Sequence, residues 1–104
     1  IEGFKTVQKF LPNKVDFIKI GHHGAKNVLD NSMVKALNFD YALISAGDDQ
    51  FNHPHYSTVE ILEENKIKTA STKDFGFIKI ILNKANKIVF YRFDGNKNKF
   101  IELF

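Results

Sequence analysis

The segment from Val15 to Ile20 is mostly apolar and runs directly into the sequence Gly21-His22-His23-Gly24. Only two charged residues interrupt it, so it is typical of a strand that is covered on both faces, as in layered α/β proteins. Glycine tolerates sharp turns and close approach of the backbone to a ligand. A buried strand that ends in a histidine pair between two glycines therefore favours a layered α/β fold and indicates a ligand-binding or metal-binding site.

Helical and strand patterns alternate along the chain. Apolar spacings of three and four predict a helix over residues 3–11. Cap residues followed by apolar side chains predict a short helix through Met33, Val34 and Leu37 and a third helix from about Thr58 to Asn65. Apolar runs bounded by turn residues predict strands over residues 15–20, 41–45, 67–70, 77–82, 88–93 and 100–104. This order predicts a layered α/β domain that finishes in antiparallel hairpins.

Two of the predicted helices carry signals for their first residues. Asp30 or Ser32 could cap the helix that follows them. Ser57, with Glu60 three residues later, matches the capping-box pattern. The third helix is therefore expected to begin at about Thr58, with the Ser57 hydroxyl as its cap.

The amino-acid composition limits the kinds of domain and site that the chain can form. The chain has 104 residues, of which 43% are hydrophobic, so it suits one small domain. It has no cysteine, so a metal ion would need nitrogen and oxygen ligands. Its 15 basic and 12 acidic residues permit an anionic substrate without indicating one. No apolar run approaches the roughly 20 residues of a membrane-spanning helix, so no membrane contact is expected from this segment. A cytoplasmic protein and an extramembrane domain of a membrane protein both stay open.

A second histidine cluster, His53-Pro54-His55, follows the second predicted strand. In extended backbone a His-x-His spacing places both rings on one face. Ligands of α/β proteins collect where strands end, and both histidine clusters lie at such positions. Asp48 and Asp49 could add oxygen ligands, although two acids in a loop are more often simply solvated.

Each cluster also has a plainer interpretation. His22 and His23 could belong to a glycine-flanked surface loop, and His55 could lie in a polar turn before a capped helix. Because adjacent residues of extended backbone point to opposite faces, one histidine of the pair is expected to bind a metal and the other to orient it or contact substrate. Two clusters after successive strands favour a site over two unrelated loops.

Three motifs, residues 16–24, 41–47 and 52–55, occur in an order that resembles the C-terminal half of the metallo-β-lactamase fold. The resemblance is closest to the ComEC-type competence hydrolases, which carry similar K-V-G-H-H-G-S, A-I-I-S-V-G and G-H-P-H series. It implies the αββα layering of that fold, with a mixed sheet and helices on one face. Ala25, Asn52 and Tyr56 depart from the residues common in that branch and bear on substrate contacts.

The resemblance also implies roles for the histidines. His23 corresponds to the last metal ligand of a two-metal site that holds Zn²⁺, with Mn²⁺ or Fe as alternatives. His22, His53 and His55 would be catalytic groups that line the same site. The implied reaction is hydrolysis of a phosphodiester or another ester by a metal-activated water, and an anionic ester or a nucleic acid would be the substrate.

In that family an N-terminal half supplies an H-x-H-x-D-H motif, a further histidine and a bridging aspartate. These motifs are not in this sequence. The resemblance therefore implies that residues 1–104 form one domain that is the C-terminal fragment of a larger one, inactive without its N-terminal partner. The main alternative is a non-catalytic half-domain that docks on another polypeptide.

Overall fold

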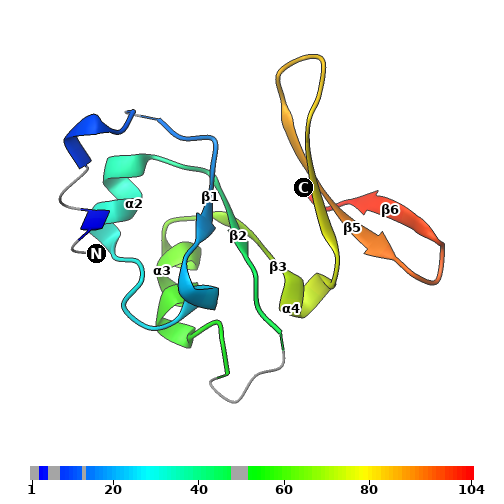
Figure 1. Cartoon of the computed structure of the whole chain (residues 1–104), viewed down its shortest axis with the longest axis horizontal. Coiled ribbons are helices and arrows are strands. Elements are labelled where there is room, and N and C mark those ends of the chain that lie inside the picture. The colour runs from blue at the N-terminus through cyan, green and yellow to red at the C-terminus, as the bar shows by residue number, and fades with distance from the viewer. Residues whose placement is uncertain (1–2, 5–7, 13, 48–51) are drawn as a thin grey trace.

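The computed structural model describes residues 3–4, 8–12, 14–47 and 52–104 of the chain. In these ranges the protein is a mixed α/β domain with two three-stranded sheets and three α-helices whose bounds are defined (Figure 1). The helices are α2 (Asn31–Leu37), α3 (Tyr56–Glu64) and α4 (Thr72–Phe75), and the 3₁₀ turns are η1 (Gln8–Phe10) and η2 (His22–Gly24).

The first sheet is parallel, with the strand order β1 (Phe17–Ile20), β2 (Tyr41–Ile44), β3 (Lys68–Ser71). Ile20 pairs with Ile44, and Ile44 pairs with Ser71. The three strands therefore end side by side, and the loops that follow them begin at the same edge of the sheet.

The main core lies between this sheet and the helices α2 and α3. Its buried members come from β1, β2, both helices and the segments that flank α2: Ile20, Leu29, Val34, Leu37, Phe39, Ala42, Ile44 and Leu62. Asp30 caps α2 by accepting a hydrogen bond from the backbone N–H of Met33, which settles the choice between Asp30 and Ser32. The Ser32 hydroxyl in turn donates to the Asp30 carboxylate.

The second sheet is antiparallel, with the order β4 (Ile78–Leu82), β5 (Ile88–Asp94), β6 (Lys99–Glu102). Asn83 and Asp94 begin the two hairpin turns, where their side chains accept backbone N–H groups two residues later. The ring of Phe90 in β5 lies 5.8 Å from that of Phe17 and 5.4 Å from that of Tyr41. Aromatic packing therefore joins the two sheets.

The structure confirms the expected α/β class and the antiparallel finish, but the described strands form one parallel and one antiparallel sheet and not the expected mixed sheet. Strand β3 leads into α4, a helix that the sequence patterns do not predict, and Gly76 follows it with a φ of 72°. This left-handed position turns the chain away from β3, so β4 starts a separate sheet. The predicted strands are otherwise recovered, with ends shifted by one or two residues.

The helix expected over residues 3–11 is helical at residues 3–4 and at Gln8–Phe10, and residues 5–7 lie outside the described part. Throughout the ranges that the structure describes, no helix combines the length and the hydrophobicity that crossing a membrane requires.

Candidate functional site

The site is built at the carboxyl edge of the parallel sheet. Strand β1 leads into the turn η2, β2 leads into Ser45 and Ala46, and β3 leads into α4. The parallel register aligns these three strand ends, so residues that are far apart in sequence meet at one edge.

The histidine pair lies in a left-handed turn and not in extended backbone. His22, His23 and Gly24 have φ angles of 49°, 56° and 75°. Two backbone hydrogen bonds close the turn, from Gly24 N–H to Gly21 O and from Ala25 N–H to His22 O, each of 3.0 Å. The sequence-based expectation assumed that His22 and His23 continue the extended strand, with their rings on opposite faces. This assumption was wrong, because β1 ends at Ile20 and both histidines lie in the turn.

Such a turn is costly for residues other than glycine. The left-handed region costs about 1–2 kcal/mol for each L-residue with a side chain, and it persists only where neighbouring structure enforces it. His22 and His23 both occupy it. Gly21, at φ −70°, has a conformation that any residue adopts, so of the two flanking glycines only Gly24 is required by its backbone.

The second histidine segment holds this turn in place. The backbone N–H of His55 donates to Gly24 O over 2.8 Å, and the buried hydroxyl of Thr58 donates to Ala25 O over 2.8 Å. Pro54 packs directly on Gly24, where a Cβ would lie 2.7 Å from the proline Cβ. The two histidine segments therefore form one unit.

Three of the four histidine rings meet as a result. The ring centroids of His22 and His23 are 6.4 Å apart, and each lies 5.9 Å from the ring of His53. His22 and His23 are exposed, and His53 is half-buried. We call His22, His23 and His53 the histidine cluster.

The hydrogen bond of His23 fixes its tautomer. Its Nδ1 lies 2.8 Å from the backbone oxygen of Ser45, at the end of β2. A carbonyl oxygen only accepts, so Nδ1 carries the proton, and the neutral ring presents the lone pair of Nε2. Metal-binding histidines are commonly oriented in this way, with the second ring nitrogen donating to a backbone carbonyl.

His55 has the opposite arrangement. Its Nδ1 accepts the backbone N–H of Ser57 over 3.1 Å and lies 2.7 Å from the Ser57 hydroxyl. His55 is therefore the N-cap of α3, and its neutral ring carries the proton on Nε2. Its ring packs against Tyr56, with the ring centroids 4.6 Å apart.

The predicted Ser57 cap was therefore wrong, and α3 begins at Tyr56. The physical reason is that the imidazole Nδ1 of His55 accepts the backbone N–H of Ser57, so the helix begins directly after His55 and Ser57 already lies in its first turn. Cap preferences favour Ser, Thr, Asp and Asn, so nothing in the local pattern selects His55.

The donor set is incomplete for a metal ion. Over residues 3–4, 8–12, 14–47 and 52–104, no group of three or more His, Asp or Glu side chains is arranged to hold a metal. Asp48 and Asp49, the predicted carboxylate partners, lie outside the described residues. Within these ranges the imidazole of His23 is oriented as metal-binding imidazoles are.

Two residues of helix α4 bind the loops at the carboxyl edge of the parallel sheet, and the sequence patterns did not predict this helix. The Thr72 hydroxyl donates to Ala46 O over 2.7 Å and accepts from Ala46 N–H over 2.9 Å. The Lys73 ammonium donates to the backbone oxygen of His53 over 3.1 Å and to the side chain of Asn52 over 3.2 Å. No motif marks Thr72 or Lys73, because their roles arise only when β3 pairs beside β2.

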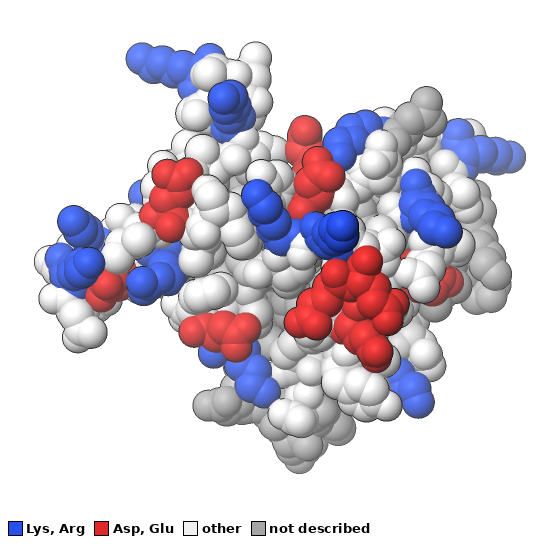
Figure 2. Space-filling view, turned by 180° about the vertical axis from the view of Figure 1, so that it is seen from behind, with Lys and Arg blue, Asp and Glu red and all other residues white. Residues whose placement is uncertain are grey.

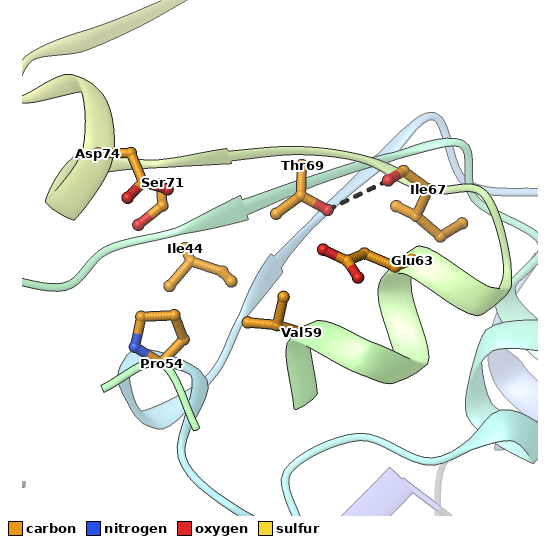
Figure 3. A pocket seen from close by; sticks show the side chains of 8 residues that line it. All are labelled: Ile44, Pro54, Val59, Glu63, Ile67, Thr69, Ser71 and Asp74. Atoms are coloured by element: carbon orange, nitrogen blue, oxygen red, sulfur yellow. Dashed lines mark hydrogen bonds between the residues drawn. The ribbon is translucent and has the colours of Figure 1, made fainter. Parts of the chain in front are cut away.

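A hollow of about 290 Å³ adjoins the site between α3 and the strands β2 and β3 (Figure 3). Pro54, from the second histidine segment, lines one end of it. Its wall is partly apolar and includes two carboxylates: the lining residues are Ile44, Pro54, Val59, Glu63, Ile67, Thr69, Ser71 and Asp74. The histidine cluster itself lies outside this lining, on the exposed edge.

Comparison with known proteins gives two relatives. The chain is 34% identical to ComE operon protein 3 of Bacillus subtilis over 79 residues, which are 74% of this chain and 10% of that protein. It is 31% identical to Recombination protein 2 of Haemophilus influenzae over 68 residues, which are 64% of this chain and 9% of that protein. These similarities support a link with competence-related proteins.

The chain spans about a tenth of the length of the curated relatives that it matches. No family model matches the chain. No solved structure matches it either.

Proposed function

We propose that the chain contributes a metal ligand and neighbouring imidazoles to a hydrolytic site of the metallo-β-lactamase type, which acts on a phosphodiester or another ester. The observation that carries the proposal is the hydrogen bond from His23 Nδ1 to Ser45 O. It leaves Nε2 of an exposed imidazole available at the carboxyl edge of a parallel sheet. The similarity to ComE operon protein 3 and the order of the three sequence motifs support the same assignment.

His23 would bind the metal through Nε2, and the Ser45 carbonyl would hold the ring in the matching tautomer. An all-nitrogen and oxygen donor set suits Zn²⁺, and Mn²⁺ or Fe are alternatives. A bound metal of this kind lowers the pKa of its water to about 7 and polarises the ester oxygen. His22 and His53, whose rings adjoin that of His23, would contact the substrate oxygens or carry a proton.

Catalytic zinc sites use about three protein ligands and keep one position open. His23 supplies one, and the proposal takes the further ligands from another polypeptide segment, in the αββα layering that the family resemblance implies. The 104-residue chain alone would then bind zinc weakly and turn over no substrate. A docking half-domain without catalytic metal is the alternative, and it predicts no preference of zinc for His23.

Zinc titration of the ¹⁵N-labelled chain tests the ligand assignment. Long-range ¹H–¹⁵N spectra of the imidazoles should show the largest shift at His23 Nε2, and His23→Ala should abolish the preferred site. His55→Ala is the matched control, because the Nδ1 lone pair of His55 is used by the helix cap. Equal zinc binding by the parent chain and His23→Ala would contradict the proposal.

Hydrolysis of bis(4-nitrophenyl) phosphate tests the requirement for a second segment. With Zn²⁺ or Mn²⁺ added, the chain is expected to give no rate above that of the metal in buffer. Turnover by the 104-residue chain that is abolished in His23→Ala would show that the described site is complete by itself. That result would leave the ligand assignment standing and overturn the need for a partner segment.

A further inference from the structure

The hydrogen bond that orients His23 ends on a backbone oxygen and not on a carboxylate. Metal-binding imidazoles are oriented by carboxylates, carbonyls or water. A carboxylate side chain can turn to follow a ring, whereas a backbone carbonyl points where its rigid peptide plane points. The orientation of His23 therefore depends on what holds the peptide between Ser45 and Ala46, to which the Ser45 oxygen belongs.

The ion pairs Lys14–Asp40 and Arg92–Asp94 lie away from this peptide. The first stands at the amino ends of β1 and β2, and the second belongs to β5. On the face seen in Figure 2, the largest group of Asp and Glu side chains lies over the body of the molecule and is open to solvent. Exposed charges of this kind are screened by water and salt. The peptide is held instead by a neutral hydroxyl.

The hydroxyl of Thr72 binds the peptide from its other side. The Ala46 N–H, which belongs to the same peptide as the Ser45 oxygen, donates to Thr72 Oγ1 over 2.9 Å. In a trans peptide the N–H and the C=O point in opposite directions within one plane. Thr72 and His23 therefore bind the two sides of one rigid unit, and the hydroxyl sets the direction of the Ser45 carbonyl.

The same hydroxyl also binds the next peptide of the chain. It donates its one proton to Ala46 O over 2.7 Å, so only a lone pair is left to meet the Ala46 N–H. Ser45, Ala46 and Thr72 are all half-buried, which shields these bonds in part from water. Hydrogen bonds along such a chain of polar groups strengthen one another. Thr72 therefore fixes Ala46 on both sides.

The register of the sheet brings Thr72 to this position. Ser71 pairs with Ile44 at the end of the parallel sheet, so the residue after Ser71 lies beside the segment that follows β2. Ser71 is the cap of α4 and accepts the Lys73 N–H over 3.2 Å, which leaves the hydroxyl of Thr72 available for Ala46. Thr69 differs, because its hydroxyl donates over 3.3 Å to Ile67 O, two residues earlier in its own segment.

We propose that Thr72 is a positioning residue of the histidine site. Through the Ser45–Ala46 peptide it holds the imidazole of His23 with its proton on Nδ1, which leaves the lone pair of Nε2 for a metal ion. Thr72 itself touches neither metal nor substrate. Without the hydroxyl the peptide turns more freely, and the Ser45 oxygen becomes a poorer acceptor for the ring. The consequence for metal binding rests on the proposed function, whereas the effect on the ring does not.

Long-range ¹H–¹⁵N spectra of the metal-free chain, at a pH where the imidazoles are neutral, test the proposal. Thr72→Val keeps the shape of the side chain and removes the hydroxyl, so the fraction of His23 with its proton on Nδ1 should fall. Thr72→Ser keeps the hydroxyl and should retain the parent fraction. Thr69→Val is the matched control, because it removes a half-buried hydroxyl that binds only its own segment.

Zinc titration of the same variants gives a second readout. The affinity of His23 Nε2 for zinc should fall by about tenfold in Thr72→Val, the lower end of the loss that follows removal of an outer partner of a metal ligand. Thr69→Val should leave this affinity unchanged, even where urea unfolding shows a similar loss of stability. This comparison separates positioning of the ring from a general effect on the fold.

Three results would overturn the proposal: a parent-like tautomer of His23 in Thr72→Val, an equal change in Thr69→Val, or loss of the parent spectrum in Thr72→Ser. Should Thr72→Val fail to fold, Thr72→Cys decides, because a thiol is a weak donor and a weak acceptor. It should lower the fraction of the Nδ1-protonated ring, and a parent-like fraction would count against the proposal. A parent chain without zinc preference for His23 would contradict the proposed function alone, because the tautomer is measured without metal.

Discussion

Gly24 lies so close to Pro54 that a Cβ on the glycine would stand 2.7 Å from the proline Cβ and 3.4 Å from Ile44 Cγ2. This contact presses the two histidine segments together at the end of the parallel sheet. It also places the ring of His53 beside those of His22 and His23. The histidine cluster therefore depends on one position where only glycine fits.

Gly24→Ala should lower the free energy of unfolding by about 2–4 kcal/mol. The left-handed backbone accounts for about 1–2 kcal/mol and the overpacking against Pro54 for a similar amount or more. Urea unfolding followed by circular dichroism measures the change. Gly21→Ala is the control in the same turn: its Cβ would meet no atom within 4 Å, and its φ is −70°. Equal effects of the two substitutions would contradict the packing argument.

His55→Ala should cost about 0.5–2 kcal/mol of unfolding free energy, the loss typical of a helix N-cap. His55→Asn should retain most of it, because asparagine is a favourable cap residue. Ser57→Ala should cost less than His55→Ala, since the backbone N–H of Ser57 would still reach the imidazole. If Ser57→Ala were the more damaging change, the hydroxyl and not the imidazole would cap α3.

The strands and the helices α2 and α3 could be predicted because local patterns determine them. The predicted strands became β1 to β6, and the cap of α2 is Asp30, one of the two residues predicted for it. The separation of the two sheets could not be predicted. The separation depends on α4 and on the positive φ of Gly76. Helix α4 spans only residues 72–75, which is too short for a helical periodicity to show in the sequence.

The proximity of three of the four histidines could be predicted, but the orientation of their rings could not. Two histidine clusters after successive strands did indicate a common edge, and the structure brings His22, His23 and His53 together there. Their orientation could not be derived, because the rules for extended backbone do not apply to a left-handed turn. Which ring nitrogen is available depends on partners such as Ser45 O, 22 residues away in sequence.

The neutral rings of His23 and His55 should be opposite tautomers. His23 donates from Nδ1 to Ser45 O, whereas His55 accepts at Nδ1 from Ser57 N–H. Long-range ¹H–¹⁵N correlation spectra of the metal-free chain distinguish the two forms directly. We expect His23 with its proton on Nδ1 and His55 with its proton on Nε2. Finding the proton of His23 on Nε2 would remove the observation on which its role as a ligand rests.

Phe90→Ala should be the most destabilising of these substitutions, at about 3–5 kcal/mol, because truncation of a buried phenylalanine leaves a cavity. Phe90 is 1% exposed, and its ring contacts Phe17, Tyr41 and Phe104 where the two sheets meet. Phe77→Ala, at a side chain that is 66% exposed, should change the unfolding free energy by no more than about 0.5 kcal/mol. Should Phe90→Ala fail to fold, Phe90→Leu gives a smaller loss that urea unfolding can still measure. A cost for Phe90→Leu no greater than that for Phe77→Ala would show that the two sheets are not held together by this ring.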